Sequence, residues 1–330
     1  MSKTKLATLL FVALIGIGIL SVLFGSVPLL LSEVWAALTG NGQEAHRDIV
    51  VNLRLPRILL AGFVGGGLGV AGATFQALLR NPLAEPYILG VSGGASFGAV
   101  LVLSTGLAVT SSWTLPLAAF AGALLAIFLV FRIAISTGGA MDVRILLLSG
   151  VVIAAFFSAC IAFILSISPA RTVQSAILWT MGSLAGADWN RVIIAGAYTM
   201  PAAAVLISLA RPLNLMAIGE ETAYYLGANV EGVKRISLIV AALITAASVS
   251  VAGVIGFVGL VVPHTLRILV GSDHRGLLPL SFLGGATFLI GADFVARLVL
   301  SPIEIPIGVI TAFIGVPFFL VLLRQSAVTE

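Results

Sequence analysis

Long apolar runs alternate with short polar or Pro/Gly breaks along most of this chain. Ten runs approach the length of about 20 residues that a helix needs to cross a bilayer. They cover residues 6–31, 57–79, 87–107, 113–135, 144–168, 190–210, 235–255, 256–270, 276–300 and 306–324. The pattern predicts an all-α polytopic membrane protein with one domain over residues 1–330. The eighth run is short, and we expect Pro263 to break its helix.

One charged segment, residues 211–235, interrupts this apolar pattern. Its charged residues are Arg211, Glu220, Glu221, Glu231, Lys234 and Arg235. Each of these charges would be costly inside lipid, so the segment must leave the bilayer. Glu220 and Glu221 favour a helix start, and Leu226-Gly227 predicts a turn between two short helices. A structured polar segment of this length is typical of a surface offered to a partner.

The composition agrees with a membrane protein. Of 330 residues, 60% are hydrophobic and only 9% charged, with a mean hydropathy of +1.18, whereas soluble domains carry about 25% charged residues. The single Cys160 excludes an intrachain disulfide, and no His/Cys cluster suggests a metal site. The net charge of +4 reflects loop topology and does not indicate a nucleic-acid partner.

The basic residues suggest an orientation. Lys3 and Lys5 precede an apolar run longer than the roughly 7–15 residues of a signal-peptide core, so we expect a retained span with a cytoplasmic amino terminus. The charged segment and the carboxyl terminus then also lie in the cytoplasm. On this topology 11 of the 17 Lys and Arg residues lie inside and 6 outside, in keeping with the positive-inside tendency.

An internal repeat supports the layout. Val70-Ala71-Gly72 and Pro82 recur as Val251-Ala252-Gly253 and Pro263 at the same spacing. The sequence 93–97 (GGASF) recurs as 284–288 (GGATF). Because the first copy starts outside and the second inside, we expect an inverted repeat, which is typical of transport proteins.

The second apolar run contains a glycine-rich stretch. It lacks the Gly-Lys-Ser/Thr ending of a phosphate-binding loop, which appears nowhere in the chain, so we expect no ATP hydrolysis by this protein itself. Glycines four residues apart let helix backbones approach closely in lipid. The sequence therefore predicts helix packing at Gly62, Gly65, Gly66 and Gly69.

Arginines mark the predicted outer side. Arg54 and Arg57 either snorkel towards headgroups or dock an acidic partner, since a guanidinium matches carboxylates. Arg297 has a second explanation, an ion pair with Asp293 four residues earlier. Residues 168–184 suit a short interfacial helix; alternatively this segment lines an outer vestibule with Arg171 facing an anionic solute.

Two turns are expected on the inner side. Residues 80–86 contain two prolines and an Asn-Pro pair, which together favour a chain reversal. The turn before the fifth run carries Asp142, Val143 and Arg144, and the charges of Asp142 and Arg144 are expected to be solvated.

Several motifs in one order resemble the permease family of binding-protein-dependent ABC importers for iron-siderophores, haem and cobalamin. The resemblance runs from about residue 54 to residue 323. It is carried by the following stretches: 54–57 (RLPR), 72–86 (GATFQALLRNPLAEP), 89–92 (LGVS), 181–183 (MGS), 219–220 (GE), 226–227 (LG), 256–264 (GFVGLVVPH), 273–275 (DHR), 292–293 (AD), 296–297 (AR) and 304–308 (EIPIG).

The resemblance implies ten helices per subunit and two permease subunits around a central pathway, with a homodimer expected. It also implies two separate ATPase subunits that bind ATP and Mg, and a periplasmic or lipid-anchored binding protein that delivers a metal chelate. The location would be a bacterial or archaeal plasma membrane. ATP-driven alternating access would then import a ferric siderophore, haem or cobalamin.

The resemblance also implies site residues. The charged segment corresponds to cytoplasmic coupling helices that contact the ATPase, through Glu220, Glu221, Tyr224, Leu226, Gly227 and Ala228. Arg54, Arg57 and Arg297 match arginines that receive acidic residues of the binding protein. Asp142 and Val143 match the inner gate, although the hydroxyl residues of a related permease type are absent there.

Two other functions remain open on the sequence. An ion-coupled secondary transporter can also have inverted repeats, but it would want acidic residues near the bilayer midplane, whereas most acids here lie in loops or near span ends. An intramembrane enzyme would need a metal-binding or nucleophile–base motif, and none is recognisable.

Overall fold

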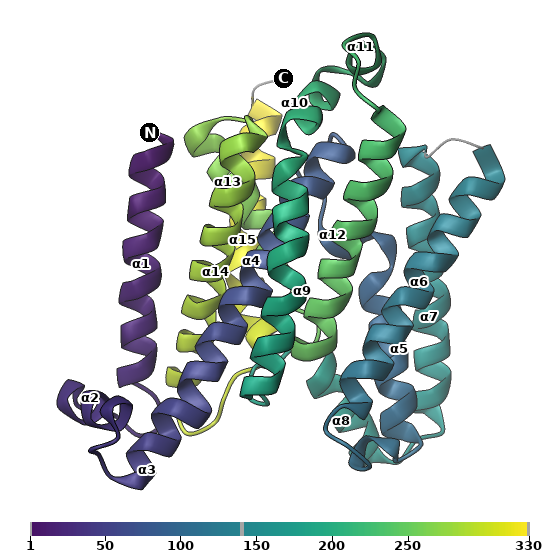
Figure 1. Ribbon diagram of the computed structural model, residues 1–330. Helices are drawn as coiled ribbons and strands as arrows, with labels where there is room; N and C mark the ends of the chain where they lie inside the picture. The colour runs from purple at the N-terminus through teal and green to yellow at the C-terminus, as the bar shows by residue number, and fades with distance from the viewer. Residues whose placement is uncertain (1, 139–141, 329–330) are drawn as a thin grey trace.

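The computed structural model describes residues 2–138 and 142–328 as an all-helical bundle (Figure 1). Its α-helices are α1 (Lys3–Leu23), α2 (Leu31–Thr39), α3 (Glu44–Arg47), α4 (Leu55–Leu78), α5 (Val91–Ser104), α6 (Thr114–Gly138), α7 (Val143–Ser166), α8 (Ala170–Thr180), α9 (Trp189–Ser208), α10 (Ala210–Ile218), α11 (Glu220–Tyr225), α12 (Val230–Ala252), α13 (Val258–Val270), α14 (His274–Leu298) and α15 (Ile307–Val328). A π-helical stretch, η1 (Asp48–Arg54), and two 3-10 turns, η2 (Pro86–Leu89) and η3 (Leu107–Val109), connect them.

The ten predicted spans correspond to α1, α4, α5, α6, α7, α9, α12, α13, α14 and α15. Seven stretches of the described residues are long and apolar enough to cross a membrane, and α5, α13 and α15 add three shorter apolar helices. The first span ends earlier than expected, at Leu23, because the chain turns before Pro28 and starts α2 at Leu31. The prediction of about ten membrane helices is confirmed.

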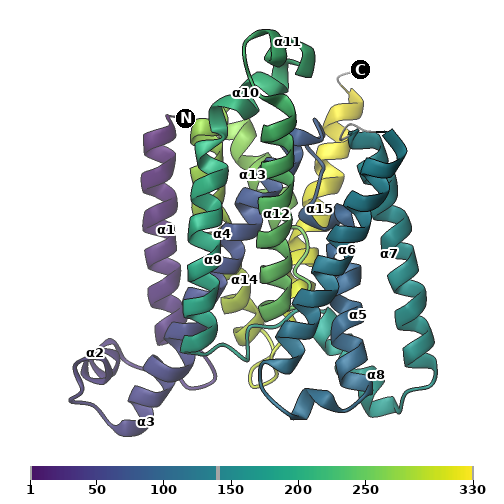
Figure 2. The same ribbon diagram turned by 45° about the vertical axis from the view of Figure 1, so that its right-hand side comes forward.

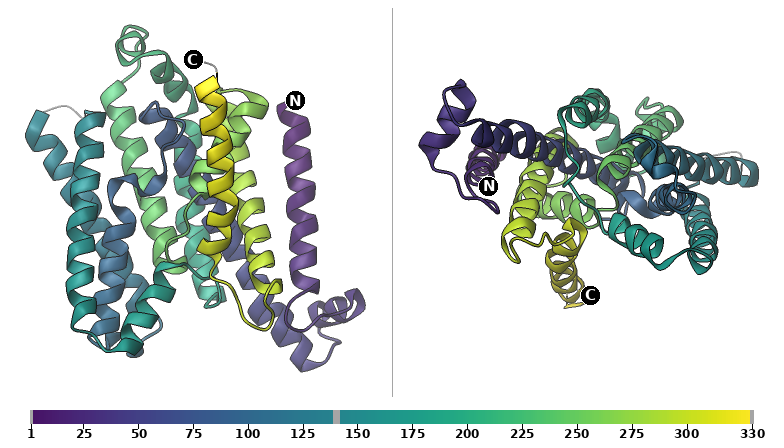
Figure 3. Two further views of the ribbon diagram at one scale, coloured as in Figure 1. Left: turned by 180° about the vertical axis from the view of Figure 1, so that it is seen from behind. Right: turned by 90° about the horizontal axis from the view of Figure 1, so that it is seen from below.

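The bundle has two distinct ends (Figures 1 and 2). At the α11 end lie α10, α11, the start of α1 and the end of α15; at the α2 end lie α2, α3 and α8. Seen from below, α1 stands at the edge of the bundle (Figure 3), and only Leu6 and Ser21 of this helix are buried. The charged segment therefore shares an end with both chain termini.

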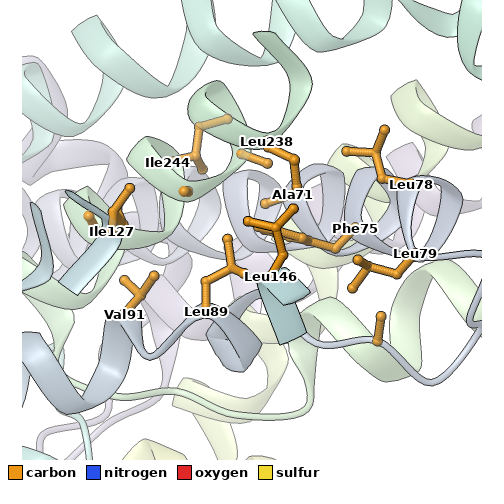
Figure 4. Packing of buried hydrophobic residues seen from close by; sticks show 14 of the residues in the cluster. Ala71, Phe75, Leu78, Leu79, Leu89, Val91, Ile127, Leu146, Leu238 and Ile244 are labelled. Carbon is orange, nitrogen blue, oxygen red and sulfur yellow. The ribbon is translucent and has the colours of Figure 1, made fainter. Parts of the chain in front are cut away.

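Helix α4 is the central helix of the fold. Nineteen of its 24 residues are buried, and it packs against α9, α12, α13 and α14. Figure 4 shows how Ala71 and Phe75 of α4 meet Leu238 of α12 and Leu146 of α7 in the largest core cluster. Burial on every side explains why the apolar stripe of α4 extends around the whole helix.

Glycines set how closely α4 approaches α14. A β-carbon on Gly65 would lie 2.3 Å from the Gly285 carbonyl oxygen, and one on Gly69 would lie 2.2 Å from that of Ser281. A β-carbon on Gly66 would lie 2.9 Å from the ring of Phe282, whereas one on Gly62 would have ordinary clearance, 3.8 Å from the side chain of Ile290. Of the four glycines predicted to pack helices, three are therefore in tight contact.

Pro263 does not break its helix, which corrects the expectation from the sequence. It lies inside α13, and the break falls earlier, at residues 253–257. Proline lacks the N–H that would bond the carbonyl four residues earlier, here that of Gly259. The side chain of Gln76 instead donates to the carbonyl oxygens of Gly259 and Leu260, at 3.4 and 3.2 Å, which lets the helix continue.

The repeat is inverted for one of its two matched parts. Helices α4 and α12, which carry the Val-Ala-Gly matches, run in opposite directions (Figure 1). The glycine-rich matches lie on α5 and α14, and both of these run from the α11 end towards the α2 end. In each of these two helices a glycine meets a facing backbone: Gly94 meets Gly122 and Gly285 meets Gly65. Close helix packing therefore explains the second match.

Candidate functional site

The charged segment forms a small structure that projects from the α11 end of the bundle (Figures 1 and 2). Gly219, with φ of 152°, separates α10 from α11, and Gly227, with φ of 83°, lies in the turn that leads to α12. The predicted turn at Leu226-Gly227 thus joins a short helix to the long α12, and the turn between the two short helices is at Gly219. Helix α11 begins at Glu220, as expected for carboxylates at the positive end of a helix dipole.

Most of α11 is exposed, and its single buried residue anchors it. Ala223 is fully buried, whereas Tyr224 is 71% exposed, Tyr225 80% and Leu226 61%. The two tyrosine rings pack edge to face with centroids 6.0 Å apart. An apolar, aromatic tip held away from the bundle is typical of a contact surface for another protein.

An ion-pair cluster fixes α11 to the bundle. Lys234 on α12 has a side chain only 6% exposed and pairs with Glu220; Glu231 lies 3.8 Å from the same ammonium group. Arg80, beyond the end of α4, approaches the other oxygen of Glu220 at 3.8 Å. A buried ammonium is costly without a carboxylate partner, so Lys234 constrains where Glu220 lies.

A polar cavity of about 660 Å³ adjoins this cluster. Asp142 and Val143, the predicted gate residues, line it together with Glu220 and Lys234. Asp142 also caps α7, because its carboxylate accepts the N–H of Arg144 at 2.7 Å. The tertiary fold therefore brings the candidate gate and the candidate coupling residues around one cavity, although 78 residues separate Asp142 from Glu220 in the sequence.

A second polar link ties α10 to the α13–α14 turn. Asn214 donates to Asp273 at 2.7 Å, and its amide oxygen accepts the backbone N–H of His274 at 2.9 Å. Lys3 pairs with the same Asp273 at 2.6 Å. Hydrogen bonds from Lys3, and then from Asn214, hold the pKa of Asp273 below its ordinary value. Sequence reasoning missed Asn214, whose signal was an amide side chain between the apolar residues Leu213 and Leu215.

At the α2 end the three predicted docking arginines already have partners within the chain. Arg57 bonds Asp293 at 2.9–3.1 Å and Glu304 at 2.9 Å. Arg297, 8% exposed, pairs with the same Asp293 at 3.0 Å, the intrahelical pair that the sequence offered as its second explanation. Arg54 is 6% exposed and donates to the carbonyl oxygens of Val22 and Leu23. Glu304 is the most exposed of the carboxylates in this cluster, at 43% of its side chain.

Comparison with known families decides the identity. A profile of the FecCD transport family matches residues 12–325, nearly the whole chain. This chain belongs to the FecCD transport family.

Relatives in the FecCD family support this assignment over most of their length. The chain is 46% identical to the cobalamin import system permease protein BtuC of Halobacterium salinarum, covering 86% of this chain and 76% of that one. It is 38% identical to the hemin transport system permease protein HmuU of Yersinia pestis, over 96% and 94% of the two chains. The Fe(3+) dicitrate transport system permease protein FecD of Escherichia coli is 40% identical, over 97% and 98%.

Solved structures show the same fold. A metal-chelate type ABC transporter in an inward-facing conformation matches with a TM-score of 0.87 at 32% identity, over 98% of this chain and 99% of that one. PsaBC from Streptococcus pneumoniae in complex with Fab matches with a TM-score of 0.56 at 16% identity, over 88% and 95%, which supports the fold alone. The protein is thus a transmembrane permease subunit of an ABC importer, and such subunits are not enzymes themselves.

The remaining predicted residue of this FecCD permease, Arg171, lies near the start of α8 at the α2 end. The predicted short helix is present as α8, and the side chain of Arg171 is exposed. Both earlier interpretations, an interfacial helix and an outer vestibule, are compatible with this position.

Proposed function

We propose that this permease imports a metal chelate by ATP-driven alternating access, with ATP and Mg bound by separate ATPase subunits that contact α11. The observation that carries the proposal is the construction of α11: an exposed aromatic tip, Tyr224 to Leu226, on a helix anchored through Glu220 to the buried Lys234. A force that the ATPase applies to this tip would be transmitted to Lys234 and α12, because the ion pair of Glu220 with the buried Lys234 resists separation. Glu221, Gly227 and Ala228 lie within or directly after the same helix and complete the proposed contact surface.

The α11 end is assigned to the cytoplasm of a bacterial or archaeal cell. The predominance of Lys and Arg on this side supports the assignment, and both chain termini share it. A periplasmic or lipid-anchored binding protein would then approach the α2 end.

A second copy of the chain is the proposed partner within the membrane. Helix α7 exposes Leu148, Val151 and Phe156, and α15 exposes Phe313 and Leu320. An apolar cavity of about 540 Å³ lies beside α15, lined in part by Val254, Phe257 and Val309. Two copies facing each other through α7 and α15 would enclose an apolar route for the cargo. Such a route binds the cargo only weakly, so that the cargo can leave as well as enter.

The cargo class is proposed from what the relatives are named for. Cobalamin, hemin and Fe(3+) dicitrate each combine a metal ion with an organic chelating ligand, so a chelate of this kind is proposed here too. The exposed guanidinium of Arg171 favours an anionic one, with haem and ferric siderophores ahead of corrinoids.

Docking of the binding protein is proposed to centre on Arg57. Its second carboxylate partner, Glu304, is partly exposed, so a carboxylate of the binding protein can replace it without uncovering the buried Asp293. Arg54 and Arg297, which are buried, would support this surface without contacting the binding protein directly. Charge reversal at Arg57 should weaken binding-protein capture in a salt-dependent way; unchanged affinity at all salt concentrations would remove Arg57 from the interface.

Reconstituted transport tests the function itself. The permease, its ATPase and its binding protein are placed in proteoliposomes, and the binding protein is first screened against haem, ferric siderophores and cobalamin. We expect uptake that vanadate inhibits and a protonophore does not. Protonophore-sensitive, vanadate-resistant uptake would instead support an ion-coupled secondary transporter.

A further inference from the structure

The break between α12 and α13 is held in an unusual backbone conformation. Helix α12 ends at Ala252 and α13 begins at Val258. Gly253 and Phe257 have φ of 70° and 68°, and Phe257 carries a side chain in the left-handed region, which such residues rarely adopt unless neighbours hold them. A break inside a membrane bundle also leaves backbone N–H and C=O groups that need partners.

Two side chains from a distant segment supply those partners. The hydroxyl of Tyr87 donates to the carbonyl oxygen of Ile255 at 3.0 Å and accepts the N–H of the same residue at 3.2 Å. The N–H of Phe257 donates to Oε1 of Glu85 at 2.7 Å. Both side chains come from the turn between α4 and α5, about 170 residues earlier in the chain.

The same break forms a wall of the 540 Å³ cavity. Phe257 and Val254 line it opposite Val309 and Ala312 of α15. The Phe257 side chain lies so close to α15 that a β-carbon on Gly315 would be 2.3 Å from its ring. The start of α15 is fixed in turn, because Gly308 donates its N–H to the Met181 carbonyl oxygen at 3.0 Å. A change in the break therefore displaces the Phe257 ring against a fixed helix and reshapes the cavity.

We propose that Glu85 and Tyr87 are positioning residues for transport: they set the arrangement of the 253–257 break and, through Phe257, the shape of the cavity wall. The inference rests on the proposed function, in which this cavity belongs to the transport route. The turn that carries them begins at Arg80, whose guanidinium approaches Glu220 of α11. The short stretch from Arg80 to Tyr87 thus contacts the charged segment at one end, through an ion pair, and the break at the other, through hydrogen bonds.

The hydrogen bonds from Glu85 and Tyr87 to the 253–257 break form a clamp, and hydrogen exchange of the purified permease tests this clamp without any partner protein. In Glu85→Leu the amide of Phe257 loses its acceptor, and in Tyr87→Phe the amide of Ile255 loses its acceptor. Each of these amides should exchange about tenfold faster in its variant, as measured in the peptide containing residues 253–260. Glu85→Gln keeps an acceptor oxygen and should exchange like the parent. Tyr198→Phe is the matched control, since the Tyr198 hydroxyl has no hydrogen-bond partner among the described residues. Parent-like exchange in both Glu85→Leu and Tyr87→Phe would overturn the clamp, as would a Glu85→Gln variant that exchanges like Glu85→Leu.

Thiol labelling in the cavity tests the role of Glu85 and Tyr87 in transport. Cys160 is first replaced by Ser, and Ala312→Cys is introduced to report on the cavity by its rate of thiol modification in proteoliposomes, with and without ATP and vanadate. We expect the ATP-dependent change in rate to shrink about tenfold in Glu85→Leu and Tyr87→Phe, with uptake lost in parallel, and to persist in Glu85→Gln and Tyr198→Phe. If the parent transports and Glu85→Leu transports equally well, the inference is wrong. A parent that shows no ATP-driven uptake refutes the proposed function, and the exchange experiment still decides the clamp.

Discussion

Lys234, with a side chain only 6% exposed, forms an ion pair with Glu220 in the first turn of α11. The side chain of Glu220 is 39% exposed. The two partners differ in burial, so removing one or the other has unequal consequences. Loss of Glu220 leaves an ammonium group buried beside a more distant Glu231, whereas loss of Lys234 leaves a carboxylate that water can reach.

Replacement of Glu220 should therefore be more damaging than replacement of Lys234. We expect Glu220→Ala to abolish most ATP-driven uptake and Lys234→Met to retain part of it, with both variants inserted in the membrane. The ratio of transport to ATP hydrolysis in proteoliposomes measures the effect. Glu221→Ala separates the ion pair from the contact surface, because Glu221 belongs to the proposed contact surface but makes no ion pair within the described residues. We expect a smaller loss of uptake than in Glu220→Ala, and an equal loss would point to the charge of α11, and not to its pair with Lys234, as the cause.

The carboxylate of Asp293 should be a strong determinant of stability at the α2 end. It is 2% exposed and pairs with both Arg57 and Arg297. Asp293→Asn leaves two guanidinium groups with reduced compensation, which we expect to cost about 3–5 kcal/mol. Thermal unfolding in detergent measures this cost. Glu304→Gln, at a partly exposed position, should cost less than about 1 kcal/mol, and equal melting of both variants would contradict the prediction.

Close packing of α4 on α14 should make glycine substitutions unequal. Gly65→Ala places a methyl group against the Gly285 backbone, so we expect a loss of about 1–3 kcal/mol from overpacking. Gly62→Ala has room for its methyl group and should be neutral or slightly stabilising. The difference in melting temperature between the two variants is the readout. A Gly62→Ala variant that melts as early as Gly65→Ala would show that helix spacing is not the reason for these glycines.

The link from Asn214 to Asp273 gives a pH dependence of known sign. Because the pKa of Asp273 is lowered in the folded protein, its contribution to stability is present above the ordinary aspartate pKa of about 3.9 and is lost as the pH falls through the lower folded value. The parent should melt at a higher temperature than Asp273→Asn at pH 7, and the gap should narrow below about pH 4. A gap that widens on acidification would rule out Asp273 as the ionised partner of Lys3 and Asn214.

Local patterns in the sequence predicted much of the fold. Span number, the exposed charged segment and the helix start at Glu220 each depend on hydropathy or on capping within a few residues, and such signals are readable without a structure. Pro263 shows the limit of this approach. Its effect on α13 depends on Gln76, which lies on another helix nearly 190 residues earlier and supplies the donors that a proline-interrupted helix lacks.

In the candidate site too, some features were predictable from the sequence and others depend on the tertiary structure. The sequence alone determined that this is a membrane protein of about ten spans with one long charged segment, because apolar length and charge are properties of consecutive residues; the order of its motifs added the resemblance to a permease family. Only the tertiary structure decided which charges meet: Lys234 with Glu220, Arg57 with Asp293 and Glu304, and Glu85 with the amide of Phe257. Such pairs join helices far apart in the chain, and whether a charge is buried with a partner or faces water depends on how those helices pack.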